Sequence, residues 1–244
     1  RCPQPLPISE LILAADTYIT VPCLKTHIVT DYTVALKNGY AVLPQPTCIE
    51  LHKQARVEHS LADLNRARPP ALAAVAGWDG AEGIAGGTHF ERPAGARVML
   101  AGADPVAVDV VSREVMCLTA PTRHLTWAME DGLGEGRLEC IRVRGDGLGA
   151  CRHPFMSPSD EVAMNLPGLE LHDLRACSGC RTTALAVLSR LDGQQLSQPL
   201  HVIYGHEGEL PSLEGLSLAV GDCTACHAGC MAHVAGCPPQ ESAI

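Results

Sequence analysis

The spacing of the cysteines near the C-terminus constrains the fold of this chain more than any other feature of its sequence. Twelve cysteines occur among 244 residues, and six of them lie in the last 68. A chain of this length can build a hydrophobic core without disulfide staples, so cysteines gathered in one segment more often bind metal. We therefore expect the C-terminal segment to fold around a shared thiol site.

Four of these cysteines stand in motifs that favour a cofactor ligand. Cys177-Ser-Gly-Cys180 precedes an apolar stretch predicted to be a helix, whose N-terminus would stabilise anionic thiolates. Cys223 ends a Gly-x-Cys motif after a predicted strand, and Cys237 precedes two prolines. Proline after cysteine fixes the backbone and shields the sulfur. Four thiolates from three separate loops predict a [4Fe–4S] cluster bound by Cys177, Cys180, Cys223 and Cys237.

The same residues leave other interpretations open. Four thiolates also suit a structural zinc ion, paired cysteines would form disulfides, and Cys177 with Cys180 alone would form a redox dithiol. Cys223-Thr-Ala-Cys226-His227 matches the attachment pattern of c-type haem. Cys226 and Cys230 are alternative ligands or a local redox pair. Cysteines in apolar runs are expected to be buried, namely Cys23, Cys117 and Cys140.

Alternation of predicted strands and helices determines the expected fold class. Apolar residues make up 46% of the chain and aromatic residues only 3%, so the core must be aliphatic. Strands are expected at Tyr18–Pro22, Ala71–Ala76, Arg97–Leu100 and Glu139–Arg144, and helices at residues 7–15, after Asp104, and at Leu125–Glu130. This order predicts an α/β fold with a mostly parallel sheet flanked by helices.

Composition divides the chain into three parts. Residues 1–145 form the expected α/β domain. Residues 146–175 are rich in Gly, Pro, Ser and Asp and predict a linker or loop-rich crossover. Residues 176–244 predict a small Cys-rich α/β unit, with a helix at Thr182–Arg190 and strands at Leu200–Tyr204 and Leu216–Val220.

The ends and the charge of the chain limit its location and partners. No apolar run reaches the roughly 18–20 residues of a membrane span, and no signal segment opens the chain. The expected location is the cytoplasm, although the N-terminus of this chain does not itself indicate it. The chain begins at Arg1 without a methionine, which predicts a fragment or a processed product. The formal charge of −9 argues against nucleic acids and anionic membranes as partners. The expected partners are a redox protein or a small anionic ligand.

The lysines are few and close together in the sequence. Of eighteen basic residues only Lys25, Lys37 and Lys53 are lysines, and they fall within twenty-nine residues. Lysine offers a compact charge with a tunable pKa that arginine cannot replace. These lysines are therefore more informative than the arginines about where a functional site lies.

Four stretches of the N-terminal half resemble a known family. They are residues 21–27 (VPCLKTH), residues 35–39 (ALKNG), the Asp79-Gly80 to Glu82-Gly83 loop, and residues 103–109 (ADPVAVD). Together, from about residue 14 to 145, they resemble the uncharacterised, iron–sulfur-associated family called domain of unknown function 362. That family usually has a further N-terminal segment, so the resemblance implies an N-terminally truncated chain.

The C-terminal cysteines resemble a second family. Their C-x-G-C, G-x-C and G-C-P-P motifs are similar to the proximal-cluster frame of nickel–iron hydrogenase small subunits and the related complex I subunit. The resemblance implies that Cys177, Cys180, Cys223 and Cys237 are the ligands. The segment is shorter here, and His227-Ala-Gly-Cys230 replaces a typical glycine pair. We take the resemblance as support for the cluster and not for hydrogenase activity.

The matched motifs also contain a candidate catalytic set. Lys25 and His27 follow a predicted strand and Asp79 follows another, which places them at the carboxyl edge of the sheet, where ligands bind. Lys25 and Lys37 would pair with a substrate carboxylate or phosphate, while His27 and Asp79 transfer protons.

Other polar residues of these motifs have simpler expected roles. Asp104 is expected to cap a helix and Asp109 to support that helix or a neighbouring loop. Glu82 suits a solvated loop or the site, and His52 and His59 suit the surface. A mononuclear metal on His27, His52 and Asp79 is compatible with the sequence, although no spacing demands it.

Three functions follow from these features. The first is a redox protein, and as an enzyme an iron–sulfur oxidoreductase, whose [4Fe–4S] cluster exchanges electrons with a partner or with a ligand of the α/β domain. The second is a non-redox enzyme or small-anion-binding module with a structural zinc or cluster. The third is a c-type haem carrier.

Overall fold

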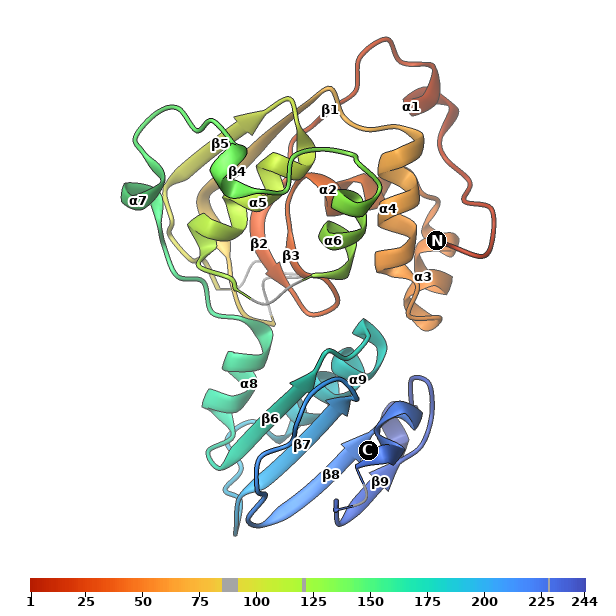
Figure 1. Ribbon diagram of the computed structural model, residues 1–244, viewed down its shortest axis with the longest axis vertical. Coiled ribbons are helices and arrows are strands. Elements are labelled where there is room, and N and C mark those ends of the chain that lie inside the picture. The colour runs from red at the N-terminus through yellow and green to blue at the C-terminus, as the bar shows by residue number, and fades with distance from the viewer. Residues whose placement is uncertain (85–91, 120–121, 228) are drawn as a thin grey trace. The chain divides into compact units, whose positions relative to one another are not determined.

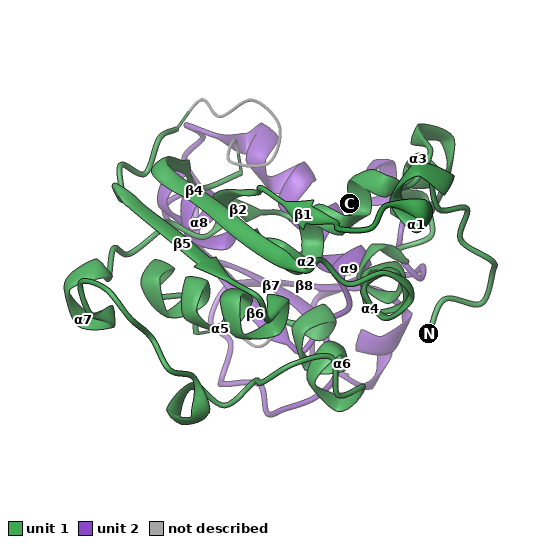
Figure 2. Cartoon of the chain, turned by 90° about the horizontal axis from the view of Figure 1, so that it is seen from above, with its two compact units in different colours: residues 1–157 green, residues 158–244 purple. Residues whose placement is uncertain are grey.

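Two sheets of different construction organise the chain, one in each of its two units. Residues 1–157 form the first unit and residues 158–244 the second (Figure 2). The computed structural model describes residues 1–84, 92–119, 122–227 and 229–244 (Figure 1). The sequence from residue 83 to 87 is rich in glycine and predicts a loop, which lies outside the described residues from position 85 onward.

The sheet of the first unit is mixed. Strand β4 pairs in parallel with β1 and β2 and antiparallel with β5, and β2 pairs antiparallel with β3. The strands are β1 (Ile19–Thr20), β2 (Cys23–His27), β3 (Asp31–Thr33), β4 (Leu72–Ala81) and β5 (Val98–Gly102). The α/β fold class is confirmed, and the two antiparallel pairs are an addition that the helix–strand alternation did not indicate.

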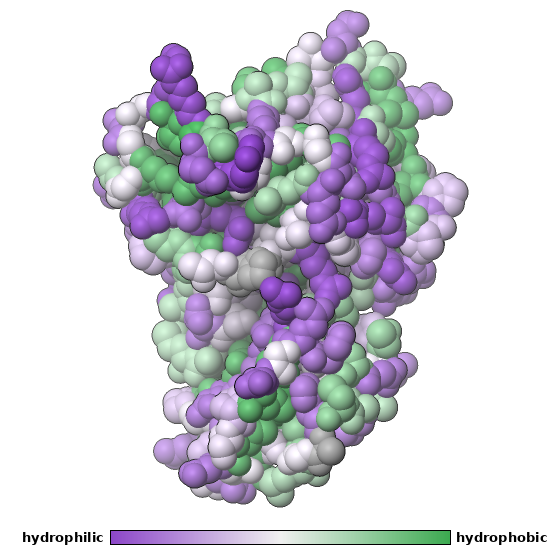
Figure 3. Space-filling view, viewed as in Figure 1, coloured by the Kyte–Doolittle hydropathy of each residue, from purple (hydrophilic) through white to green (hydrophobic). Residues whose placement is uncertain are grey.

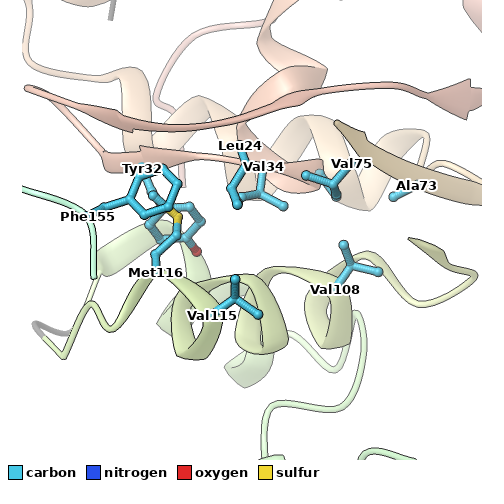
Figure 4. Close-up of a cluster of buried hydrophobic side chains, with 10 residues drawn as sticks. Leu24, Tyr32, Val34, Ala73, Val75, Val108, Val115, Met116 and Phe155 are labelled. Atoms are coloured by element: carbon cyan, nitrogen blue, oxygen red, sulfur yellow. The ribbon is translucent and has the colours of Figure 1, made fainter. Parts of the chain in front are cut away.

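Helix α5 (Pro105–Met116) packs against this sheet. Its Val108, Val115 and Met116 face Leu24 and Val75 of the strands across a core cluster that is almost free of solvent (Figure 4). Full burial of one such side chain contributes roughly 1.5–3 kcal/mol. The remaining helices of this unit are α1 (Glu10–Ala14), α2 (Ala35–Asn38), η1 (Gly39–Val42), α3 (Gln45–Lys53), α4 (Val57–Ala67), α6 (Arg123–Glu130), η2 (Leu138–Cys140) and α7 (Leu148–Cys151).

Asp104 begins helix α5, as predicted. Its carboxylate accepts hydrogen bonds from the N–H groups of Val106 (2.9 Å) and Ala107 (3.0 Å). These bonds satisfy two donors that have no partner within the helix, and Pro105 suits the first helical position because it has no N–H. The helix-cap role of Asp104 is confirmed.

The sheet of the second unit is wholly parallel among the described residues. Its strands lie in the order β6 (Leu169–Leu174), β7 (Leu200–Gly205), β8 (Leu216–Val220) and β9 (Ala232–Val234) (Figure 1). The helices are α8 (Pro158–Asn165), α9 (Ser178–Leu188), η3 (Ser189–Leu191), η4 (Asp222–Cys226) and η5 (Glu241–Ala243). The two strands predicted in this part are present as β7 and β8, and the predicted helix begins earlier, at Ser178.

Several sequence-based expectations differ from the structure. Glu139–Arg144 is not a strand, because its first residues belong to η2 and the rest is irregular. Segment 146–175, expected to be a linker or crossover, contains α7, α8 and β6, and the division between the units falls at residue 157. Strand β6 was missed because half of its side chains are polar. Three cysteines expected in the interior are exposed: Cys23, Cys117 and Cys140.

Ion pairs cover part of the first unit. Strongly hydrophilic residues gather over α4 and α6 on the face in Figure 3, where Arg1 pairs with Asp63 and Asp131, and Arg66 also pairs with Asp131. Exposed pairs of this kind add little to stability individually. In the described part of the chain, no helix combines the length and the apolar character needed to cross a membrane.

Candidate functional site

Three cysteine-bearing loops leave the second sheet at the same edge. Strands β6, β8 and β9 end at Leu174, Val220 and Val234, and a cysteine follows three residues after each end. The carboxyl ends of parallel strands meet at one edge, so the loops are gathered there. Cys180 lies in the first turn of α9. We call Cys177, Cys180, Cys223 and Cys237 the four-thiol site.

The pKa of Cys180 is influenced by the other three cysteines of the four-thiol site. Cys180 is 1% exposed. Its pKa is raised first by a hydrogen bond with the Cys177 thiol, then by burial, and then by the charges of Cys177, Cys223 and Cys237. The pKa of Cys223 is also raised, by burial and by Cys177, while the backbone of Gly205 acts in the opposite direction. Thiolates so close together repel one another, and a cationic centre between them would remove that repulsion.

Gly221 lets its loop approach Cys180 closely. Its φ is +102°, and an added Cβ would lie 2.5 Å from the sulfur of Cys180. The neighbouring loops are tied together, since Gly221 N–H donates to Val234 O (2.8 Å) and Asp222 N–H donates to Gly236 O (3.0 Å). Gly236 N–H in turn donates to the Asp222 carboxylate (2.6 Å). A hydrogen-bonded backbone therefore holds Cys223 and Cys237 in place.

The four thiols are more widely spaced than the ligands of one zinc ion. A tetrahedral zinc with Zn–S bonds of about 2.3 Å holds its sulfurs about 3.8 Å apart. Among the described residues, no three cysteine sulfurs all lie within 4.8 Å of one another. Cys226 and Cys230 are not among the main influences on the pKa of Cys180.

A second candidate site lies in the first unit, at Lys25, His27 and Lys37, which we call the basic cluster. Burial first, and then the charge of Lys25, lower the pKa of Lys37 to about 8. Burial also lowers the pKa of Lys25. The pKa of His27 is well below its usual range, because of burial first and then the charges of Lys37 and Lys25. The three side chains therefore act on one another.

His27 is held as a neutral imidazole. Its Nδ1 accepts hydrogen bonds from the N–H groups of Val29 (3.1 Å) and Thr30 (3.4 Å), so its proton is on Nε2. Lys25 and His27 lie inside strand β2 and not in a loop after a strand, because β2 continues into a hairpin with β3. The prediction of a loop was wrong at these residues.

The structure does not bring Asp79 into the basic cluster. Asp79 lies within β4, is exposed, and is not among the charges that act on His27 or Lys37. His52 is exposed on α3, where its Nδ1 lies 2.7 Å from Cys48 O. In the described residues, His27, His52 and Asp79 do not form a metal-sized group.

The other predicted positions have structural roles. Glu82 pairs with Arg92 (3.1 Å) and accepts a hydrogen bond from Met156 N–H (2.8 Å). Its carboxylate is therefore used to hold the chain segments around it. His59 is half-buried against the ring of Trp127, and not a surface residue as expected.

Buried Asp109 positions the helix that carries Lys37. Its carboxylate accepts the Leu36 N–H (3.3 Å), and Asn65 holds the Leu36 carbonyl from the other side (3.0 Å). Asp109 is fully buried, and burial raises its pKa to about 7 against the opposing effect of the Leu36 N–H and Tyr32. The sequence assigned Asp109 a supporting role, but it gave no signal for Asn65.

We expect Asp109 to make stability depend on pH. Its pKa is about 7 in the folded chain and about 3.9 in the unfolded chain, so the folded state holds an extra proton between those values. Stability should fall as pH rises from about 4 to about 7, by up to about 1.4 kcal/mol per pH unit. Asp109→Asn, which is neutral throughout, should show a smaller slope when urea unfolding is measured across this range. Equal slopes in the two proteins would contradict this assignment.

A separate cavity of about 450 Å³ lies between β5, α5 and the segment from Ile141 to Cys151. Asp104 lines it, but none of the basic cluster does. The predicted catalytic lysines and this cavity are therefore different places in the first unit.

Comparison with known proteins identifies the N-terminal part of the chain. The model of the family described as Domain of unknown function (DUF362) matches residues 2–114. The match begins earlier and ends sooner than the range of about 14–145 suggested by the motifs. No curated protein and no solved structure matches the chain.

Proposed function

Since residues 2–114 match the model of the DUF362 family, whose description assigns no activity, we propose a function from the geometry of the second unit. The four-thiol site binds a [4Fe–4S] cluster, and the protein transfers electrons. The observation that carries this proposal is the convergence of three loops, each with a cysteine three residues beyond a parallel strand.

Other features of the site support a cluster over a single metal ion. The sulfur spacing exceeds that of zinc ligands, and Gly221 allows the backbone to approach Cys180 without a side chain between them. The N-terminus of α9 lies beside Cys177, where its free N–H groups favour negative charge. When bound, the cluster supplies one-electron chemistry. The residues of this chain bind it, orient it and limit the access of water to Cys180.

The electron partner is a redox protein or a ligand of the basic cluster. A [4Fe–4S] cluster moves one electron at a time and needs both a donor and an acceptor outside itself. The exposed thiols of Cys223 and Cys237 keep one side of the four-thiol site accessible to such a partner. Cys180 supplies the buried side.

Anaerobic purification tests the proposal. About four irons and four acid-labile sulfides per chain, with visible absorption that bleaches reversibly on reduction with dithionite, are expected. Zinc without iron would contradict the redox role and support a structural metal. Covalently bound haem that survives denaturation would instead support Cys223-Thr-Ala-Cys226-His227 as a haem attachment site.

A second candidate function is the binding of a small anion by the basic cluster. Lys25 and Lys37 lie close enough for one charge to lower the pKa of the other, and both are partly desolvated. A carboxylate or phosphate between them would offset that repulsion through charge-assisted hydrogen bonds. This function is compatible with a cluster or with a structural metal in the second unit.

Lys25→Ala is expected to weaken pyrophosphate binding by roughly tenfold or more, because it removes one charge-assisted hydrogen bond. Binding by the unmodified chain should also weaken as pH rises through about 8, where Lys37 loses its proton. Calorimetric titration at pH 7 and 9 measures both effects.

Lys53→Ala is the matched control for this experiment, since Lys53 is an exposed lysine at the end of α3. It should bind pyrophosphate like the unmodified protein. A large drop in the melting temperature of Lys25→Ala would make Lys25 structural, and equal weakening in both variants would mean non-specific attraction.

A further inference from the structure

Glu170, His172 and His201 form a polar group on β6 and β7, at one edge of the second sheet. Glu170 and His172 lie two residues apart on β6, so their side chains point to the same face. Strand β7 lies beside β6 (Figure 1), and its residue His201 is directly opposite Glu170 in the parallel register. None of the three belongs to the four-thiol site or the basic cluster.

The ligand atoms of these residues have the spacing of a metal site. His172 Nε2 lies 3.0 Å from His201 Nδ1, and Glu170 Oε2 lies 3.3 Å from His201 Nδ1 and 3.9 Å from His172 Nε2. Zinc–nitrogen and zinc–oxygen bonds of about 2.0–2.2 Å place tetrahedral ligands about 3.3–3.5 Å apart. The three observed distances bracket that value.

His201 is oriented as a metal ligand. Its Nε2 lies 2.9 Å from the carbonyl oxygen of Glu214, which can only accept a hydrogen bond, so Nε2 carries the proton. The lone pair of Nδ1 therefore points at the other two residues. Ligating histidines commonly donate their second N–H to a carbonyl or carboxylate in this way. His201 is buried and its ring is fixed, which reduces the entropy lost on binding.

We propose that Glu170, His172 and His201 bind one divalent transition-metal ion of the Zn²⁺ class. Two imidazoles and one carboxylate select such ions over Ca²⁺ and Mg²⁺, which prefer all-oxygen sites. The Glu170 side chain is 60% exposed, so ions can reach the site from solvent. Three protein ligands leave a fourth position for water or a small ligand.

Binding needs one proton rearrangement within His172. Without metal, His172 Nε2–H donates to His201 Nδ1, because His201 carries its own proton on Nε2. With metal, the His172 proton moves to Nδ1 and frees the Nε2 lone pair. No net proton is released. The alternative without metal is a single His172–His201 hydrogen bond that serves only the packing of β6 against β7.

Titration of the full chain with Co²⁺ tests the proposal. Thiolate ligation gives intense sulfur-to-cobalt charge-transfer bands, whereas nitrogen and oxygen ligands give weak d–d bands alone. The second signature separates this site from the cysteines, whether or not a cluster is present. In the chain with Cys177, Cys180, Cys223 and Cys237 all replaced by serine, we expect one Co²⁺ per chain with d–d bands only, displaced by Zn²⁺, and a rise in melting temperature on metal addition.

Two variants and one control decide the assignment. His172→Ala and Glu170→Gln should each weaken the Co²⁺ site by at least about 100-fold, since loss of second-shell partners alone costs 10–100-fold. Glu170→Gln changes an exposed side chain, so it keeps the test valid if His172→Ala folds poorly. His206→Ala removes an exposed histidine of the same unit and should bind like the unmodified chain. Absence of the d–d signal, or equal affinity in all variants, would overturn the metal site and leave only the His172–His201 hydrogen bond.

Discussion

Cys237→Ser is expected to lower bound iron from about four atoms per chain to less than about one. The serine hydroxyl is a poor ligand at neutral pH, and Cys237 comes from a loop that supplies one thiol to the site. Cys177→Ser should have the same effect, because Cys177 has the largest influence on the pKa of buried Cys180. Iron and sulfide analysis of anaerobically purified protein measures the result.

Cys226→Ser is the matched control for this loss. Cys226 lies only three residues after Cys223, is exposed, and its thiol donates to the carbonyl of Cys223 (3.5 Å). Because Cys226 is not among the main influences on the pKa of Cys180, its replacement should leave about four irons per chain. Full iron retention in Cys237→Ser would sink the ligand assignment. Iron loss in Cys226→Ser would move a ligand to that residue.

Gly221→Ala is expected to destabilise the second unit by about 2–4 kcal/mol and to reduce iron binding. The added Cβ would lie 2.5 Å from the Cys180 sulfur, and the φ of +102° is strained for any residue with a side chain. Neither conflict can relax easily, since both carbonyl and N–H of Gly221 are hydrogen-bonded within the loop network. Urea unfolding of the metal-free chain separates lost stability from lost iron.

Gly229→Ala provides the control for this change. An added Cβ at Gly229 would meet nothing within 4 Å, although the residue lies in the same Cys-rich segment. Its stability should stay within about 0.5 kcal/mol of the unmodified chain. If Gly221→Ala were as stable and as rich in iron as Gly229→Ala, the close approach of this loop to Cys180 would play no part in the site.

The sequence by itself determined the features that depend on short spacing. Asp104-Pro105 predicted the start of α5 because a helix cap involves residues only two or three positions apart. Strands β7 and β8 were predicted because their apolar side chains are consecutive or alternate over a few residues. The four cysteines were grouped from motifs of two to four residues. All of these signals are local.

The tertiary structure decided which of these local features meet. In the sequence, Asp79 and Lys25 each follow a predicted strand, yet only Lys25 lies in the basic cluster with His27 and Lys37. Strand pairing, and not the order of residues in the chain, determines which side chains become neighbours. The half-polar strand β6 gave too weak an apolar pattern to be predicted. Its register with β7 nevertheless brings Glu170 and His172 to His201, about thirty residues away in sequence. Long-range strand pairing depends on how completely each face of the sheet becomes buried, and no single segment of the sequence determines that burial.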